Sequence, residues 1–379
     1  MKIHFHDLQT QYLTYKDEIN HAIQKVLDSS QFIMGPEIAE FEKLLAKYVG
    51  CNHVISCASG TDALLLALMA IDLQPTDEVI TSPFTFPAPP EVVALLGAKP
   101  VFADIDLQTY NIDSNQIAKK ITQNTRAIIP VSLYGQPADM NEINLLAKEF
   151  GERFGRKIYV IEDAAQSLGA IYQGRKSGNL SDIGCASFFP SKPLGCYGDG
   201  GAVFANDAIL AEKMRNIRVH GQIKRYEHKY IGFNCRLDTL QAAILQVKLK
   251  YFDDELKKRV SVAQFYDDNL KNADIYLPFI KADRTSVYAQ YSIRVKNRTD
   301  MIHELNAKNI PTAIHYPKPL HLQECFHYLG YQKGDFPVAE KVATEIMSLP
   351  MSAFIRCEEQ EYVVNSMKKI VEEKKEIFI

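Results

Sequence analysis

One lysine, Lys192, stands in a setting that favours chemistry over simple solvation. It lies between Pro190 and Pro193, and glycines follow at positions 195, 198, 200 and 201. Proline fixes the backbone on either side, whereas glycine permits a positive φ or a close approach of the backbone to a ligand. Apolar strands are expected before and after this segment, at 183–189 and 202–205. Alone, the pattern also fits a surface lysine on a hairpin, so its meaning depends on groups elsewhere in the chain.

Other residues suited to chemistry follow further apolar strands. Strands are expected at 53–56, 78–81 and 158–161, and helices lie between them in the sequence. A helix at 15–29 with Leu27 facing inward is expected before them, and a strand at 286–295 after them. This alternation indicates an α/β protein with a mostly parallel sheet covered on both faces. The carboxyl ends of parallel strands share one edge, where ligands bind. The residues expected at this edge are Gly60, Thr61, Phe86, Asp163 and Gln166, and a hydroxyl at Ser187 precedes the lysine.

Together with Lys192, these groups match the needs of pyridoxal 5′-phosphate (PLP). The helix that starts at Gly60 and Thr61 suits a phosphate, although Ser59 or Thr61 acting as an ordinary helix cap explains the same residues. Phe86 offers a face for the ring, Asp163 offers a carboxylate for the pyridine nitrogen, and the lysine suits the aldehyde.

Composition narrows the class of protein further. The 379 residues carry a net charge of −3, and no stretch is long and apolar enough for a membrane span, so neither a nucleic-acid nor a membrane partner is expected. The seven dispersed cysteines show no zinc-type spacing, so no metal is expected, and they fit free thiols in a cytoplasmic protein. An NAD-dependent oxidoreductase is disfavoured because Gly-x-Gly-x-x-Gly is absent. The length favours a large domain at 1–249 and a small C-terminal domain at 250–379.

Four segments, in order along the chain, resemble the DegT/StrS-type nucleotide-sugar aminotransferases. They are Glu162-Asp-Ala-Ala-Gln166, Ser187-Phe-Phe-Pro-Ser-Lys192, Gly198-Asp-Gly-Gly201 and Asn234-x-Arg236-Leu-Asp-x-Leu-Gln-Ala-Ala243. The resemblance runs from about residue 3 to the last helix. It implies PLP-dependent transferase fold type I, similar to aspartate aminotransferase, with a large, mostly parallel sheet domain and a small α+β domain.

The resemblance also implies roles for single residues. Lys192 forms the internal aldimine with PLP and moves the proton during transamination, and Asp163 pairs with the pyridinium nitrogen. Gln166 bonds the cofactor's 3′-hydroxyl and Phe86 stacks on its ring. The residues implied at the phosphate are Gly60, Thr61, Ser187 and, from the other subunit of a homodimer with shared active sites, Asn234.

Residues for the substrate are expected in loops. Gly35, His220, Arg236, His315 and Tyr316 match positions that line the sugar site in similar proteins. An arginine with a histidine and a tyrosine suits a carboxylate, which is that of glutamate, of a uronate, or of each in turn. His315 and Tyr316 before Pro317 also fit a purely structural turn, and Tyr288 and Tyr291 fit core positions better than ligand contacts.

Within the family, the segments Ser286-Val-Tyr-Ala-Gln-Tyr291 and Met347-Ser-Leu-Pro-Met351 resemble a subgroup that acts on a UDP-linked 3-oxo uronate. The resemblance implies a ping-pong reaction. L-glutamate leaves as 2-oxoglutarate and pyridoxamine phosphate then aminates UDP-2-acetamido-2-deoxy-3-oxo-glucuronate, for O-antigen or other surface polysaccharide. The alternatives are a dTDP-linked 3- or 4-oxo-6-deoxyhexose as substrate, or a non-catalytic regulatory protein on the same fold. The segment 152–157 is expected to be a surface excursion without a catalytic role.

Overall fold

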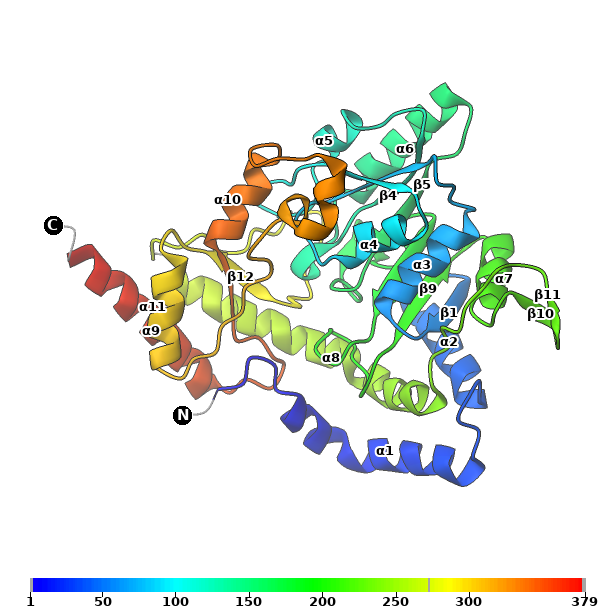
Figure 1. Ribbon diagram of the computed structural model, residues 1–379. Coiled ribbons are helices and arrows are strands. Elements are labelled where there is room, and N and C mark those ends of the chain that lie inside the picture. Colours follow the sequence, from blue (N-terminus) through cyan, green and yellow to red (C-terminus); the bar gives the residue numbers. More distant parts are fainter. Residues whose placement is uncertain (1–2, 272, 377–379) are drawn as a thin grey trace.

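A seven-stranded mixed sheet forms the centre of the computed structural model, which describes residues 3–271 and 273–376 (Figure 1). Its strand order is β1-β9-β8-β5-β4-β2-β3, and only β9 runs antiparallel to its neighbours among these strands. The mostly parallel sheet predicted from the sequence is therefore confirmed. The strands are β1 (His53–Cys57), β2 (Glu78–Thr81), β3 (Lys99–Phe102), β4 (Thr125–Ile129), β5 (Tyr159–Asp163), β8 (Ile183–Ser187) and β9 (Gly201–Ala205).

Helices cover both faces of this sheet because its strands are apolar on both faces. On one face, Ile55, Val79 and Ile129 pack in one cluster with α3, α4 and α7. On the other face, Val54 packs with α2 and α8, and Ile128 packs with α5 and α6. These helices are α2 (Pro36–Val49), α3 (Gly60–Ala70), α4 (Ala88–Leu95), α5 (Ser114–Ala118), α6 (Met140–Phe154), α7 (Ala208–Ile217) and α8 (Thr239–Leu270).

The C-terminal part of the chain forms a smaller unit against the far half of α8. The pair β12 (Tyr291–Arg294) and β13 (Ile346–Leu349) is antiparallel, and α9 (Arg298–Ala307), α10 (Pro337–Glu345) and α11 (Cys357–Glu376) surround it. Tyr291 is fully buried in its core, and Tyr288 packs on that core, as predicted. The domain boundary predicted at 249/250 falls inside α8, and the division into two domains stays a prediction.

Several minor elements connect these parts. A hairpin formed by β10 (Gln222–Lys224) and β11 (Glu227–His228) projects from the end of α7, at the right of Figure 1. A second small pair, β6 (Ile171–Tyr172) and β7 (Arg175–Lys176), follows β5. Short 3-10 turns are η1 (Leu133–Gly135), η2 (Leu320–Leu322) and η3 (Glu324–Leu329).

Three local predictions were wrong. The first helix, α1 (Leu8–Ser29), begins seven residues before the predicted start at Tyr15, because Asp7 caps it by accepting from the N–H of Thr10. Leu27, predicted to face inward, is 45% exposed. The strand predicted from Ser286 begins only at Tyr291, since Tyr288 has a φ of 45° and the chain turns there.

Two further features concern membrane spans and cysteines. Among the described residues, no helix is long and apolar enough to cross a membrane. All seven cysteines are free thiols; five are buried, and Cys325 and Cys357 are exposed.

Candidate active site

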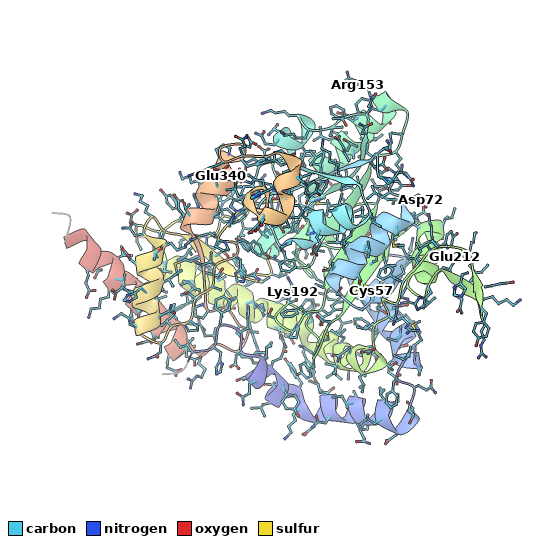
Figure 2. The ribbon with its side chains drawn as sticks, viewed as in Figure 1. Cys57, Asp72, Arg153, Lys192, Glu212 and Glu340 are labelled. Atoms are coloured by element: carbon cyan, nitrogen blue, oxygen red, sulfur yellow. The ribbon has the colours of Figure 1, made fainter. Side chains whose placement is uncertain are left out.

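Lys192 lies near the middle of the molecule, in the loop that joins β8 to β9 (Figure 2). The N–H groups of Lys192 and Cys196 bond the carbonyl oxygens of Phe189 and Phe188, both at 2.8 Å. A Cβ on Gly195 would lie 2.4 Å from the carbonyl oxygen of Pro190, so the loop closes only with glycine there. Burial lowers the pKa of Lys192, and the charge of Asp163 partly opposes this shift. The loop therefore holds Lys192 in a defined position, and its amine loses a proton more readily than an ordinary lysine amine.

Asp163 ends β5 and is 6% exposed. Its Oδ1 accepts from the N–H of Ala165 at 3.0 Å, and Oδ2 has no hydrogen-bond partner among the described residues. Burial raises the pKa of Asp163, whereas the N–H of Ala165 and the charge of Lys192 lower it. A buried carboxylate oxygen without a donor suits a ligand that brings an N–H group.

Glu162, which precedes Asp163, stabilises the end of β5 through hydrogen bonds to its carboxylate. Its carboxylate is fully buried and accepts from the Ser177 hydroxyl at 2.6 Å and from the Gly178 N–H at 2.9 Å. Burial raises the pKa of Glu162 to about 7, although these hydrogen bonds lower it. Sequence reasoning missed this supporting role, since an acid directly before Asp163 has no spacing signature of its own.

Gln166 and Tyr316 come together although 150 positions separate them. The Gln166 amide donates to the Tyr316 hydroxyl at 3.4 Å, and its Oε1 accepts from the N–H of Tyr134 at 2.8 Å. The Tyr134 hydroxyl bonds the carbonyl oxygen of His315. Burial raises the pKa of Tyr316 and lowers that of His315, and the charge of Lys192 lowers the His315 pKa further. Two of the predicted substrate residues thus lie at the same rim as Asp163 and Lys192.

A cradle for an anion lies where α3 begins. Ser59 caps the helix by accepting from the N–H of Asp62 at 3.0 Å, so the alternative interpretation as a cap is confirmed for Ser59. The N–H groups of Gly60 and Thr61 have no acceptor among the described residues. A Cβ on Gly60 would lie 2.7 Å from the Cβ of Ser187, so this helix start sits directly against the end of β8. Free N–H groups, a positive helix end and a serine hydroxyl suit a phosphate.

Phe86 is 54% exposed, although it follows a buried strand. Its ring lies 6.4 Å from the ring of Tyr316. An exposed aromatic ring beside this rim is suited to stacking on a flat ligand.

Asn234 and Arg236 lie elsewhere in the protomer. They line a cavity of about 350 Å³ with Gly198, Asp199 and Gln241. Among the described residues, Arg236 forms no hydrogen bond or ion pair with His315 or Tyr316, so their shared carboxylate site stays a prediction.

The remaining predicted substrate residues have clear backbone roles. His220 is exposed, has a φ of 63°, and accepts a hydrogen bond through its carbonyl oxygen from His228 Nδ1 at 2.8 Å. A Cβ on Gly35 would meet the Gln31 carbonyl oxygen at 2.6 Å and the Thr239 side chain at 2.8 Å. Packing alone therefore explains a glycine at 35.

Two buried polar residues of α8 bond other segments of the chain: Lys248 bonds the Lys192 loop and Arg259 bonds the segment at Tyr288. Sequence reasoning missed both. Lys248 is 3% exposed, and its Nζ bonds the carbonyl oxygen of Gly195. Burial lowers the pKa of Lys248 to about 8, while the charge of Glu255 raises it. Arg259, on the same helix, donates to the carbonyl oxygen of Tyr288 at 3.2 Å. Their placement depends on tertiary packing, because charged residues on a long helix normally face solvent.

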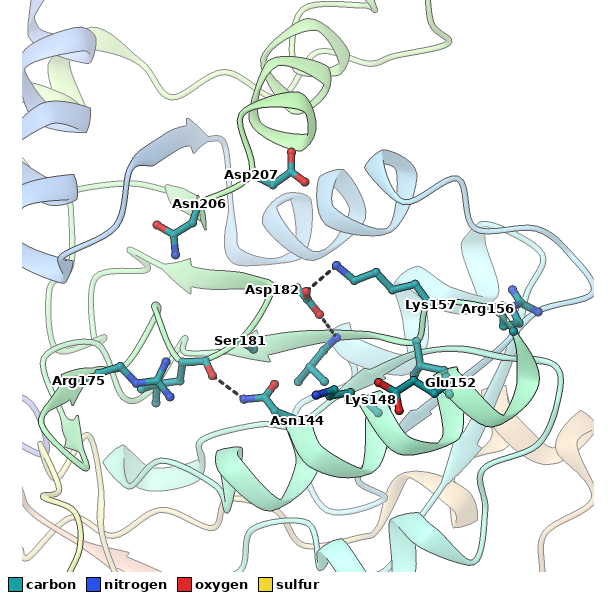
Figure 3. Close-up of a pocket in the computed structure, with 16 residues that line it drawn as sticks. Asn144, Lys148, Glu152, Arg156, Lys157, Arg175, Ser181, Asp182, Asn206 and Asp207 are labelled. Carbon is teal, nitrogen blue, oxygen red and sulfur yellow. Dashed lines mark hydrogen bonds and ion pairs between the residues drawn. The ribbon is translucent and has the colours of Figure 1, made fainter.

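A larger groove, of about 860 Å³, lies away from this rim, between α6 and the amino ends of β5 and β8 (Figure 3). Asp182 is held there between Lys157, at 2.8 Å, and the N–H of Val160, at 2.9 Å. The predicted excursion 152–157 partly extends α6 and lines this groove, opposite Asp163. None of the predicted site residues lines it, so its size does not make it the active site.

The rim residues fit PLP on their own geometry. The free oxygen of Asp163 can accept from a ring N–H, the free N–H groups of Gly60 and Thr61 can bind a phosphate, and Lys192 lies within electrostatic reach of Asp163. A sheet of this strand order, with a lysine loop after β8 and a carboxylate at the end of β5, defines a PLP-dependent transferase of fold type I.

The chain belongs to the DegT/DnrJ/EryC1/StrS aminotransferase family, whose model matches residues 14–368. It is 52% identical, over 93% of its length and 96% of the relative's, to UDP-2-acetamido-2-deoxy-3-oxo-D-glucuronate aminotransferase of Pseudomonas aeruginosa. It is 42% identical, over 97% and 99%, to dTDP-3-amino-3,6-dideoxy-alpha-D-galactopyranose transaminase of Aneurinibacillus thermoaerophilus.

The structure of S. venezuelae DesV in complex with a ketimine intermediate is similar, with a TM-score of 0.95 and 36% identity over 98% of this chain and 99% of that one. The predicted enzyme class and fold are therefore confirmed, and the protein is a sugar aminotransferase of a PLP-dependent family.

Proposed function

We propose that this aminotransferase transfers the amino group of L-glutamate to UDP-2-acetamido-2-deoxy-3-oxo-glucuronate, giving the 3-amino sugar nucleotide for O-antigen or related surface polysaccharide. The observation that carries the chemistry is the placement of the partly buried Lys192, in the loop after β8, near the buried Asp163 at the carboxyl end of β5. The choice of sugar rests on the 52% identity to the enzyme that is named for this substrate.

Each rim residue has a proposed task. PLP, when bound, supplies an electron sink for the carbon that loses or gains the amine. Lys192 would hold the cofactor through Nζ, and its amine, whose pKa burial lowers, would carry the proton at the substrate carbon. Asp163 keeps the ring nitrogen protonated, because a charged pair in a buried site is stronger than in water.

The remaining rim residues hold and orient the cofactor. Gln166 orients the 3′-hydroxyl through the amide that now meets Tyr316, and Phe86 covers the ring. Gly60, Thr61 and Ser187 bind the phosphate at the cradle.

We also propose a homodimer with shared active sites. Exposed apolar side chains lie on the loop that carries Phe32 and Ile33 and on the hairpin region that carries Tyr226 and Ile231, which is 88% exposed. Patches of this kind favour an interface between subunits. In the dimer, Asn234 of the partner subunit reaches the phosphate, and Arg236 of the partner subunit completes the carboxylate site.

The carboxylate site serves both substrates in turn. His315 and Tyr316 face it from their own chain, with Gly35 and His220 on bordering loops. An arginine forms paired, charge-assisted hydrogen bonds to a carboxylate, so the same groups suit glutamate and the uronate. Shared recognition of this kind is what a ping-pong reaction needs.

A dTDP-linked 3- or 4-oxo-6-deoxyhexose is the second candidate substrate, favoured by the 42% identity to a dTDP-sugar transaminase. A regulatory protein without activity is disfavoured, because such a protein has no need for a lysine near a buried carboxylate, and burying that carboxylate costs stability.

The test is a direct comparison of sugar nucleotides. The purified protein, with PLP and ¹⁵N-glutamate, is offered the UDP-linked 3-oxo uronate and the dTDP-linked 3-oxo-6-deoxyhexose in parallel, and products are identified by mass spectrometry. The proposal expects ¹⁵N in the UDP sugar with a kcat/KM at least about a hundredfold above that for the dTDP sugar. Preference for the dTDP sugar contradicts the substrate and keeps the enzyme class.

A further inference from the structure

The N-terminal segment that precedes α1 packs against the C-terminal unit of the chain (Figure 1). Ile3 is buried in the core of the C-terminal unit. The carbonyl oxygen of Phe5 accepts from the N–H of Met351 at 3.1 Å, and His6 Nδ1 lies 3.2 Å from the carbonyl oxygen of Met351. Phe5 and His6 are thus bonded to the N–H and to the carbonyl oxygen, respectively, of the same residue, Met351.

The second contact fixes the state of the His6 ring. A carbonyl oxygen only accepts, so Nδ1 carries the proton. In the neutral ring, Nε2 is then a bare acceptor, and it has no partner among the described residues. The pKa of His6 is lowered to about 4 by burial and by the charge of Arg259, although the bond to Met351 raises it, so the ring is neutral at physiological pH.

His6 also lies close to the reacting groups. Its ring meets that of Phe5 edge-on with centroids 4.7 Å apart, and the ring of Phe5 lies 6.2 Å from that of His315. The charges of His315 and Lys192 both act on His6. Arg259 of α8, His315 and Lys192 therefore lie near enough to His6 to act on its charge, and none of them donates a hydrogen bond to its Nε2.

A keto sugar that brings its reacting carbon to Lys192 also brings its neighbouring hydroxyl and acetamido N–H groups. These are donors, and the nearby protein groups Lys192 and Arg259 are donors as well. This inference rests on the proposed function. We propose that His6 is a specificity residue of the sugar site, whose Nε2 accepts a hydrogen bond from a hydroxyl or amide N–H of the sugar.

Two substitutions separate this role from a purely structural one. The amide of His6→Asn can occupy the place of Nδ1 and keep the bond to Met351, but it removes the acceptor at Nε2. The longer His6→Gln can place an oxygen near Nε2 and gives up the bond to Met351. His4, in the same segment, has no side-chain hydrogen bond to another described residue, so His4→Asn is the matched control.

The experiment measures both half-reactions and binding. We expect His6→Asn to raise the KM for the sugar about tenfold, with kcat and the glutamate half-reaction within twofold of wild type. His6→Gln should recover most of the sugar KM, and His4→Asn should match wild type. Isothermal titration of the amino-sugar product onto the pyridoxal form should show the same loss for His6→Asn without turnover.

An unchanged sugar KM and product affinity in His6→Asn overturns the proposal. Equal losses in the glutamate and sugar half-reactions also overturn it, because they indicate a structural role. If wild type aminates only the dTDP-linked sugar, the proposed substrate is wrong, and the same variants are compared on that sugar with the same criteria.

Discussion

Gly60 at the start of α3 and Ser187 at the end of β8 touch so closely that a Cβ on Gly60 would lie 2.7 Å from that of Ser187. This contact joins a helix N-terminus to the strand that leads into the Lys192 loop. The proposed phosphate cradle and the loop that carries Lys192 are therefore joined through β8.

Gly60→Ala should weaken binding of PLP by on the order of tenfold, because the added methyl group must push the helix start away from Ser187. Binding of pyridoxal without its phosphate should change little. Titration of the apoprotein with each compound measures the two affinities. Equal weakening for both compounds would place the effect outside the cradle.

Shared active sites predict complementation between two inactive variants. Lys192→Ala lacks the reactive amine, and Asn234→Ala lacks the contact proposed to cross the interface. When the two are co-refolded in equal amounts, about a quarter of all sites regain both groups, so activity should reach about a quarter of wild type. Absence of recovery, with heterodimers shown by native mass spectrometry, would mean that Asn234 serves its own chain.

The lowered pKa of His6 predicts acid sensitivity. The folded protein holds this ring neutral down to about pH 4, whereas the unfolded chain protonates it near pH 6.5. The unfolded state therefore binds more protons between these values, and stability present above pH 6.5 is lost as the pH falls towards 4. Between pH 7.5 and 5, wild type should lose about 1–2 kcal/mol more than His6→Asn in urea unfolding. Parallel losses would show that other groups cause the sensitivity.

A buried ion pair should hold α2 to the sheet. Arg218 is 5% exposed and donates to Glu42 at 2.6 Å and to the carbonyl oxygen of Ser56 at 2.8 Å. Glu42→Gln leaves the guanidinium charge buried without its partner, so the free energy of unfolding should fall by about 2–3 kcal/mol. Glu40→Gln, at an exposed position of the same helix, is the control and should stay within about 0.5 kcal/mol of wild type.

Much of the fold was predicted from the sequence, because the spacing of apolar residues in a strand or a helix depends only on neighbouring residues. The strand at 78–81 was predicted with its observed bounds, and Tyr291 was correctly placed in the core. The common rim of Asp163, Gln166 and Phe86 was predicted from one topological fact, that the carboxyl ends of parallel strands share an edge. Local signals were weaker at element ends, so the start of α1 and the exposure of Leu27 were missed.

The parts that sequence reasoning could not reach depend on contacts between distant segments. Lys248 and Arg259 look like solvated helix residues until α8 is packed behind the Lys192 loop. His6 lies in a segment without a periodic pattern of apolar residues. Its position against the C-terminal unit is known only from its hydrogen bond to Met351. Arg236 and His315 were grouped by residue type. No hydrogen bond or ion pair joins them among the described residues of one protomer, so their partnership remains a prediction about the dimer.

The most direct test follows one half-reaction. Protein loaded with pyridoxamine phosphate is mixed with UDP-2-acetamido-2-deoxy-3-oxo-glucuronate, and the visible absorption of the bound pyridoxal form is recorded over time. We predict a rapid return of this absorption in wild type and at least a thousandfold slower return in Lys192→Ala, about 4 kcal/mol in barrier. No return in wild type with this sugar, while glutamate still converts the pyridoxal form, would contradict the proposed substrate. Equal rates in both proteins would contradict the role of Lys192.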